Sequence, residues 1–152
     1  MSVVGYVRAT QDLDFLVVDP AVLEPTFWRS LSAPIVVEVF DGRMDWSDPL
    51  AGVVRLEDES TTEQVDVVVG KHTRWQTPIL TRAMPVALSD TVTIPVVEGA
   101  DLVLLKLFAG SPHDDNDIRM LLEAVPGLEN FVDDRVGGLA VREQKRWQRL
   151  KS

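Results

Sequence analysis

The run Asp12-Leu13-Asp14-Phe15-Leu16-Val17-Val18 sets two carboxylates two residues apart in an otherwise apolar segment. Its β-branched and alternating composition predicts a strand. Residues i and i+2 of a strand point to the same face. We therefore expect Asp12 and Asp14 to project together, and Leu13 and Phe15 to project to the opposite side.

A third carboxylate lies inside a second β-branched run, Gln64-Val65-Asp66-Val67-Val68-Val69. Aspartate is disfavoured in strand interiors, so its presence there indicates a role. If this strand neighbours the first, Asp66 joins Asp12 and Asp14 in one cluster of oxygens. Magnesium prefers oxygen ligands, and such a set can hold two ions across an in-line phosphoryl transfer. The alternative is a solvated strand face with no ligand.

The remaining pattern predicts strands first and helices last. Apolar spacing predicts helices at 20–32, 73–84, 100–108, 114–124 and 132–150, and strands at 35–40, 53–56, 65–69 and 92–97. The polar stretch 58–63 is expected to be a loop between two strands. This order indicates an α/β (α+β) fold, in which a mixed β-sheet is backed by helices and the C-terminal part is helical. At 152 residues, the chain is expected to form one domain, 1–152.

Composition restricts the class of protein. The hydrophobic fraction of 45% and the charged fraction of 26% are typical of a globular protein, and the chain has no cysteine. No apolar run is long enough for a membrane span, and the N-terminus does not resemble a secretory signal, so the expected compartment is the cytoplasm. The net charge of −9 argues against a generic nucleic-acid-binding surface but not against a nucleotide held through a metal ion.

Five segments resemble, in order, the bacterial nucleotidyltransferases of the DNA polymerase beta-like superfamily. Residues 5–15 resemble the stretch G-x-x-R-x-T-x-D-h-D, where h is apolar, and residues 48–56 with 65–70 resemble the next strands. Residues 98–107 resemble the helix E-D-L-h-h-L-K-L, and residues 110–118 the segment G-R-P-K-D-x-x-D-h. The resemblance covers about Gly5 to Leu122. Abortive-infection and toxin–antitoxin enzymes belong to this group.

The resemblance implies a mixed sheet backed by helices and a magnesium-dependent reaction. In this reaction a nucleotide moves from a nucleoside triphosphate to a hydroxyl acceptor, which is a protein, an RNA end or a small molecule. Two Mg²⁺ ions, a toxin–antitoxin partner protein and no membrane association are the further expectations. Metal binding and catalysis are matched to Asp12, Asp14 and Asp66. Substrate binding is matched to Arg8, Thr10 and Lys106, although Lys106 is equally well explained as a lysine reaching solvent from a core helix.

One part of the family pattern is not matched. The family places a glycine pair at a helix start upstream of the aspartates, where it holds the triphosphate. Here Gly5 is followed by Tyr6 and lies close to Asp12. Two explanations stay open. Either Met1 is an internal methionine of a longer chain, or the domain is degenerate and binds without catalysing.

Other features near the C-terminus have simpler interpretations. His113 is expected to be solvated, and Asp114 and Asp117 are expected to cap the helix that follows. The glycine pair in Val136-Gly137-Gly138 resembles the missing motif in composition but is expected to break the last helix. The basic segment from Arg142 to Lys151 suits a helix C-terminus, or faces an acidic partner.

Overall fold

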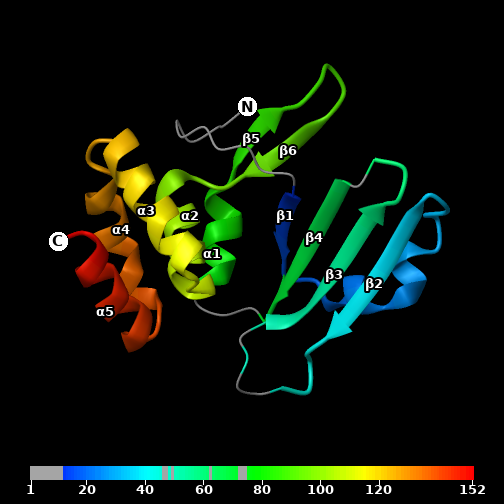
Figure 1. Cartoon of the computed structure of the whole chain (residues 1–152), viewed down its shortest axis with the longest axis horizontal. Coiled ribbons are helices and arrows are strands. Elements are labelled where there is room, and N and C mark those ends of the chain that lie inside the picture. Colours follow the sequence, from blue (N-terminus) through cyan, green and yellow to red (C-terminus); the bar gives the residue numbers. More distant parts are fainter. Residues whose placement is uncertain (1–11, 46–47, 49, 62, 72–74) are drawn as a thin grey trace. The chain divides into compact units, whose positions relative to one another are not determined.

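The computed structural model divides into two compact units (Figure 1). The sheet unit is Ala9–Thr77, and the helical unit holds Pro78–Ser152. The structure describes residues 12–45, 48, 50–61, 63–71 and 75–152, and of Asp12 it describes the backbone only. The expectation of a single domain over residues 1–152 stays a prediction.

The sheet unit is built on four strands with the order β1-β4-β3-β2 (Figure 1). The strands are β1 (Asp12–Val17), β2 (Ile35–Asp41), β3 (Leu50–Asp58) and β4 (Glu63–Gly70). β1 pairs with β4 in parallel, and the other neighbours pair antiparallel. The strands expected from apolar runs are therefore confirmed, and so is the loop between β3 and β4. β3 and β4 extend beyond the predicted ranges at both ends.

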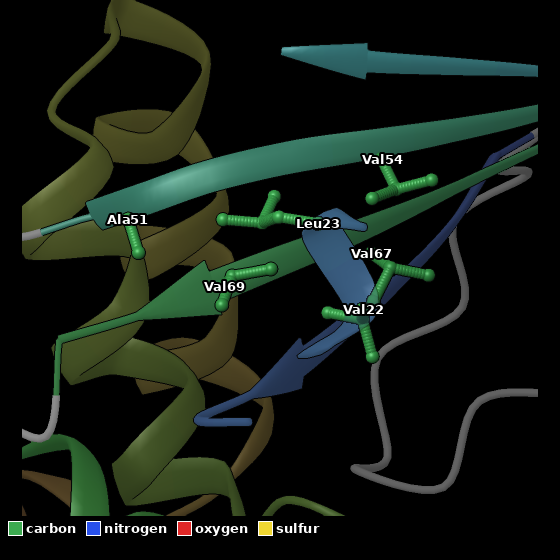
Figure 2. Close-up of a cluster of buried hydrophobic side chains, with 6 residues drawn as sticks. All are labelled: Val22, Leu23, Ala51, Val54, Val67 and Val69. Carbon is green, nitrogen blue, oxygen red and sulfur yellow. The ribbon is translucent and has the colours of Figure 1, made fainter. Parts of the chain in front are cut away.

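One face of this sheet is apolar because alternate residues of each strand point the same way. Val54, Val67 and Val69 on this face pack against Val22 and Leu23, which come from a short 3₁₀ turn (Figure 2). Val54 and Val69 are completely buried. The core of the sheet unit therefore lies on one side of the strands, and the opposite side carries a charged row beside the apolar row of Leu16, Val68, Val53 and Phe40.

The helix expected over residues 20–32 is wrong. The segment forms two 3₁₀ turns instead, η1 (Pro20–Leu23) and η2 (Pro25–Trp28). Pro25 has no amide hydrogen and disfavours helical geometry in the residue before it, and Glu24 is accordingly extended with ψ of 123°. The proline thus interrupts the apparent helical spacing. Phe27, which lies at helical spacing from the buried Leu23, is 53% exposed.

The helical unit holds a hairpin and four helices, and α1 crosses the boundary between the units. The elements are α1 (Gln76–Arg82), β5 (Met84–Ala87), β6 (Thr93–Val96), α2 (Gly99–Ala109), α3 (Pro112–Ala124), α4 (Leu128–Arg135) and α5 (Val141–Leu150). β5 and β6 form an antiparallel hairpin in which Pro85 faces Pro95, as suits strands outside a continuous sheet. The extended segment expected near 92–97 is confirmed.

The helix boundaries follow local signals in the sequence. α2 ends at Gly110, which has a φ of 79° in the left-handed region where glycine carries no steric cost. α3 begins at Ser111, whose side chain accepts from the backbone of Asp114 while Asp114 accepts from that of Ser111. The helix expected over 132–150 is divided in two, because the 3₁₀ turn η3 (Val136–Gly138) separates α4 from α5 at the glycine pair, where a break was expected.

These elements confirm a mixed α+β fold with a mixed sheet followed by C-terminal helices. Within the described ranges, no helix combines the length and apolar character needed to cross a bilayer.

Candidate carboxylate site

The register of β1 against β4 brings two of the predicted acids together. Asp14 and Asp66 are direct partners across the parallel pair. Neighbouring strands lie about 4.8 Å apart, and residues directly opposite each other share a face. Asp14 is exposed, and the side chain of Asp66 is 18% exposed. The condition set by the sequence, that the two strands are neighbours, is therefore met, and Asp14 with Asp66 forms what we call the carboxylate pair.

A line of charged residues crosses all four strands at this level. The registers place Asp14 beside Asp66, Asp66 beside Arg55 and Arg55 beside Glu38. Arg55 donates from Nε to Oδ1 of Asp66 at 2.9 Å and from Nη2 to Oδ2 at 3.0 Å. This two-point contact is the geometry in which a guanidinium binds a carboxylate most specifically. The polar face of the sheet therefore carries three acids and one arginine in register.

Arg55 is itself fixed from more than one side. The Asp66 carboxylate accepts hydrogen bonds from Arg55 and so raises the pKa of Arg55 above its ordinary value. Its guanidinium carbon lies 6.0 Å from the centre of the Phe40 ring, the outer limit for a cation–π contact. Gln64 donates to Oδ2 of Asp66 at 3.3 Å. Together these contacts hold Asp66 in one orientation.

Arg55 was not among the residues predicted from the sequence, although a signal for it was present. Asp58 and Glu63 close the hairpin between β3 and β4 as direct partners. Counting three residues back from Asp58 and three forward from Glu63 gives Arg55 and Asp66. Once a hairpin loop is assigned, its register follows by counting, so a strand arginine opposite the third acid could have been found from the expected loop at 58–63.

Two carboxylates with an arginine suit a divalent cation only in part. Carboxylate oxygens are the donors that Mg²⁺ prefers, and each ionised carboxylate has about four lone-pair sites. The two hydrogen bonds from Arg55 therefore leave acceptor sites on Asp66. Among the side chains that the structure describes, no group of three or more acids or histidines is arranged to hold a metal. The third donor would have to come from elsewhere.

Three predicted site residues contribute nothing further that can be described. Asp12 pairs through its backbone with Gln64, two residues before Asp66. Its side chain lies outside the described part of the chain, and so do Arg8 and Thr10. Their assignments to metal and substrate binding stay predictions.

Lys106 lies in the helical unit, on α2, and is ion-paired. Its Nζ is 2.7 Å from Oδ2 of Asp117 and 3.3 Å from Oδ1 of Asp114, both on α3. Burial alone would raise the pKa of Asp114, but hydrogen bonds from Ser111 and the Lys106 ammonium outweigh it and lower that pKa. Asp114 caps α3 as expected. Asp117 does not, because it lies beyond the first turn, buried against Lys106.

The comparisons with known proteins identify no family. No family model matches the chain, and a search of curated proteins gave no significant match. The nucleotidyltransferase assignment therefore depends on the residue pattern and on the register of the carboxylate pair.

Proposed function

We propose that this protein is a magnesium-dependent nucleotidyltransferase that moves a nucleoside monophosphate from a nucleoside triphosphate to a hydroxyl acceptor in the cytoplasm. The observation that supports the proposal most is the parallel register that sets Asp14 directly opposite Asp66. Two acids on neighbouring strands concentrate negative charge at one level of the sheet. A hard cation removes the repulsion between them and brings the phosphates to the same place.

The aspartate and arginine side chains have different roles in the proposed transfer reaction. Magnesium, when bound, supplies electrostatic stabilisation of the phosphoryl oxygens. Asp14 and Asp66 would hold it, with Asp12 as a further donor. Asp66 also accepts the proton of the acceptor hydroxyl as the hydroxyl oxygen bonds to the α-phosphorus and pyrophosphate departs. Arg55 is a positioning residue, because its two hydrogen bonds orient the Asp66 carboxylate without touching the reacting atoms.

Transfer of label tests the proposal. The protein is incubated with α-labelled nucleoside triphosphates, Mg²⁺ and cell extract, and labelled macromolecules and small molecules are separated. We expect transfer by the wild type and none by Asp14→Asn. Glu57→Gln is the matched control, since Glu57 is exposed and lies on β3 two residues from Arg55. Equal transfer by Asp14→Asn and the wild type would exclude this assignment.

A second candidate is a non-catalytic binding or regulatory domain, such as one component of a toxin–antitoxin pair. The Arg55–Asp66 ion pair favours it, because the arginine compensates the Asp66 charge without a metal. This candidate predicts no label transfer and no rise in melting temperature with any triphosphate plus Mg²⁺. It also predicts that the protein co-purifies with the product of a neighbouring gene.

A further inference from the structure

A pocket of about 590 Å³ opens on the surface of the helical unit. One wall is the turn between α2 and α3, with Ala109, Gly110 and Pro112, and the other wall is one face of α5. Pockets of this volume are in the range of small-molecule sites. All the lining residues belong to the helical unit, so the pocket is separate from the carboxylate pair of the sheet unit.

The α5 wall is strongly basic. Its cations recur at spacings of three and four residues, which puts them on one helical face, and all of them line the pocket: Arg142, Lys145, Arg146 and Arg149. The opposite face carries Trp147 and Leu150, which are buried. Four cations converge on one pocket of a chain whose net charge is −9. The wall of the pocket is therefore positively charged, whereas the chain as a whole is negatively charged.

Arg146 forms a fixed base for the pocket. Its Nε donates to Oδ1 of Asp115 at 2.6 Å, and its Nη2 donates to the carbonyl oxygen of Ser111 at 2.7 Å. Its side chain is only 16% exposed. A β-carbon at Gly110 would lie 2.6 Å from Nη1 of Arg146, so the glycine leaves space for the guanidinium. The base of the pocket is therefore preorganised.

The other three cations remain open to a ligand. The side chains of Arg142 and Arg149 are 84% and 69% exposed. Arg142 is held on one side by the buried Glu143, and Arg149 is 3.6 Å from Asp115. Lys145 forms no ion pair with the residues that the structure describes. The pocket thus has four cations and two carboxylates, and the excess matches a dianion.

We propose that this pocket binds the phosphate group of a small phosphomonoester. A phosphomonoester carries nearly two negative charges at pH 7, and arginine binds phosphate oxygens with two parallel hydrogen bonds. The volume of about 590 Å³ suits a small molecule, and the net charge of −9 disfavours a polyanion that extends beyond the pocket. The site goes beyond the proposed transferase activity and does not require it.

Calorimetric titration with phenyl phosphate, at constant ionic strength and in EDTA, tests the site. Phenyl phosphate is expected to bind the wild type, and Lys145→Gln and Arg149→Gln are each expected to weaken binding by about three- to tenfold. Both side chains are exposed, so melting curves should show that the variants fold. Arg119→Gln is the matched control, because Arg119 is exposed on α3 and does not line the pocket.

Three further arms complete the experiment. Phenyl sulfate has a similar shape but one negative charge, and it should bind more weakly than phenyl phosphate. Asp14→Asn should bind phenyl phosphate as the wild type does, which separates this site from the carboxylate pair. The proposal is overturned if phenyl phosphate does not bind, if Arg119→Gln weakens binding as much as Arg149→Gln, or if only a 5′-phosphorylated oligonucleotide binds.

Discussion

Asp66 and Asp101 are both held by arginines, but their surroundings differ. Asp66 lies on the face of the sheet opposite the core, with one arginine and a second acid beside it. Asp101 lies on α2 with no exposed surface, and Arg82 donates to both of its oxygens, at 2.9 and 2.6 Å. Arg135 approaches the same carboxylate at 3.2 Å. An arginine–aspartate pair is therefore part of the proposed site in one unit and a buried connection in the other.

The balance of charge separates the two cases. Around Asp101, Glu98 contacts Arg135 at 2.8 Å, so two acids meet two arginines and the group is neutral. On the sheet, three acids share a level with one arginine. A neutral and buried group needs no ligand, whereas several acids gathered around one arginine attract a cation. The helical group joins α1, α2 and α4, whereas the sheet group crosses four strands at one level.

The largest expected effect comes from breaking the buried group. Asp101→Ala leaves Arg82 and Arg135 without their shared acceptor and should lower the free energy of unfolding by about 3–5 kcal/mol. Urea unfolding followed by circular dichroism measures the change. Asp134→Ala, an exposed aspartate on α4, is the control and should unfold like the wild type. A change for Asp101→Ala no larger than that of the control would mean that the buried group is not structural.

A medium effect is expected at the start of α3, where the acid is held by a cap. Ser111→Ala removes the side-chain acceptor for the Asp114 amide and should lower the free energy of unfolding by about 1 kcal/mol, measured by urea unfolding.

The same cap predicts a pH dependence. Because the folded protein lowers the pKa of Asp114, the contribution of its carboxylate to stability is present above about pH 4 and is lost as the pH falls through the folded pKa. Asp114→Asn should therefore flatten the decline of stability below pH 4. An unchanged decline would contradict the cap assignment.

A change at Arg55 should have the smallest effect on stability, and its effect on Mg²⁺ binding is the most informative one. Arg55→Gln should change the urea midpoint less than the two changes above, because the side chains of Arg55 and Asp66 are 38% and 18% exposed and solvent partly screens their ion pair. The same change removes the arginine from Asp66, so Mg²⁺ should bind several-fold more tightly while label transfer falls. Calorimetric titration with MgCl₂ measures the first effect. Unchanged or weaker Mg²⁺ binding would show that the pair is not a metal site.

The sequence was informative wherever one segment determines its own structure. Apolar runs predicted β2, β3 and β4, and Gly110 marked the end of α2. The prediction of a helix over residues 20–32 was wrong because apolar spacing was given more weight than Pro25, which disfavours helical geometry in the residue before it. The parallel pairing of β1 with β4 stayed conditional, because nothing in either strand specifies a neighbour about fifty residues away.

The candidate sites also combine features that one segment determines with features that depend on distant segments. Arg55 could have been found from the hairpin register, since it depends on one short loop. The contact of Arg82 with Asp101 depends on the packing of α1 against α2, and no local pattern encodes it. The pocket required both the α5 stripe, which the sequence shows as a basic segment, and the α2–α3 turn that faces it.

The strand order also has a consequence for how the protein acquires its site during folding. β2, β3 and β4 are consecutive in the chain. Both pairings among them are antiparallel and join strands that are neighbours in sequence. β1 pairs only with β4 in this order, and that pairing closes a loop of dozens of residues. Long-range pairings of this kind form slowly. We expect Asp14 to reach Asp66 last, so that a chain newly made on the ribosome has a formed meander before it has a functional site.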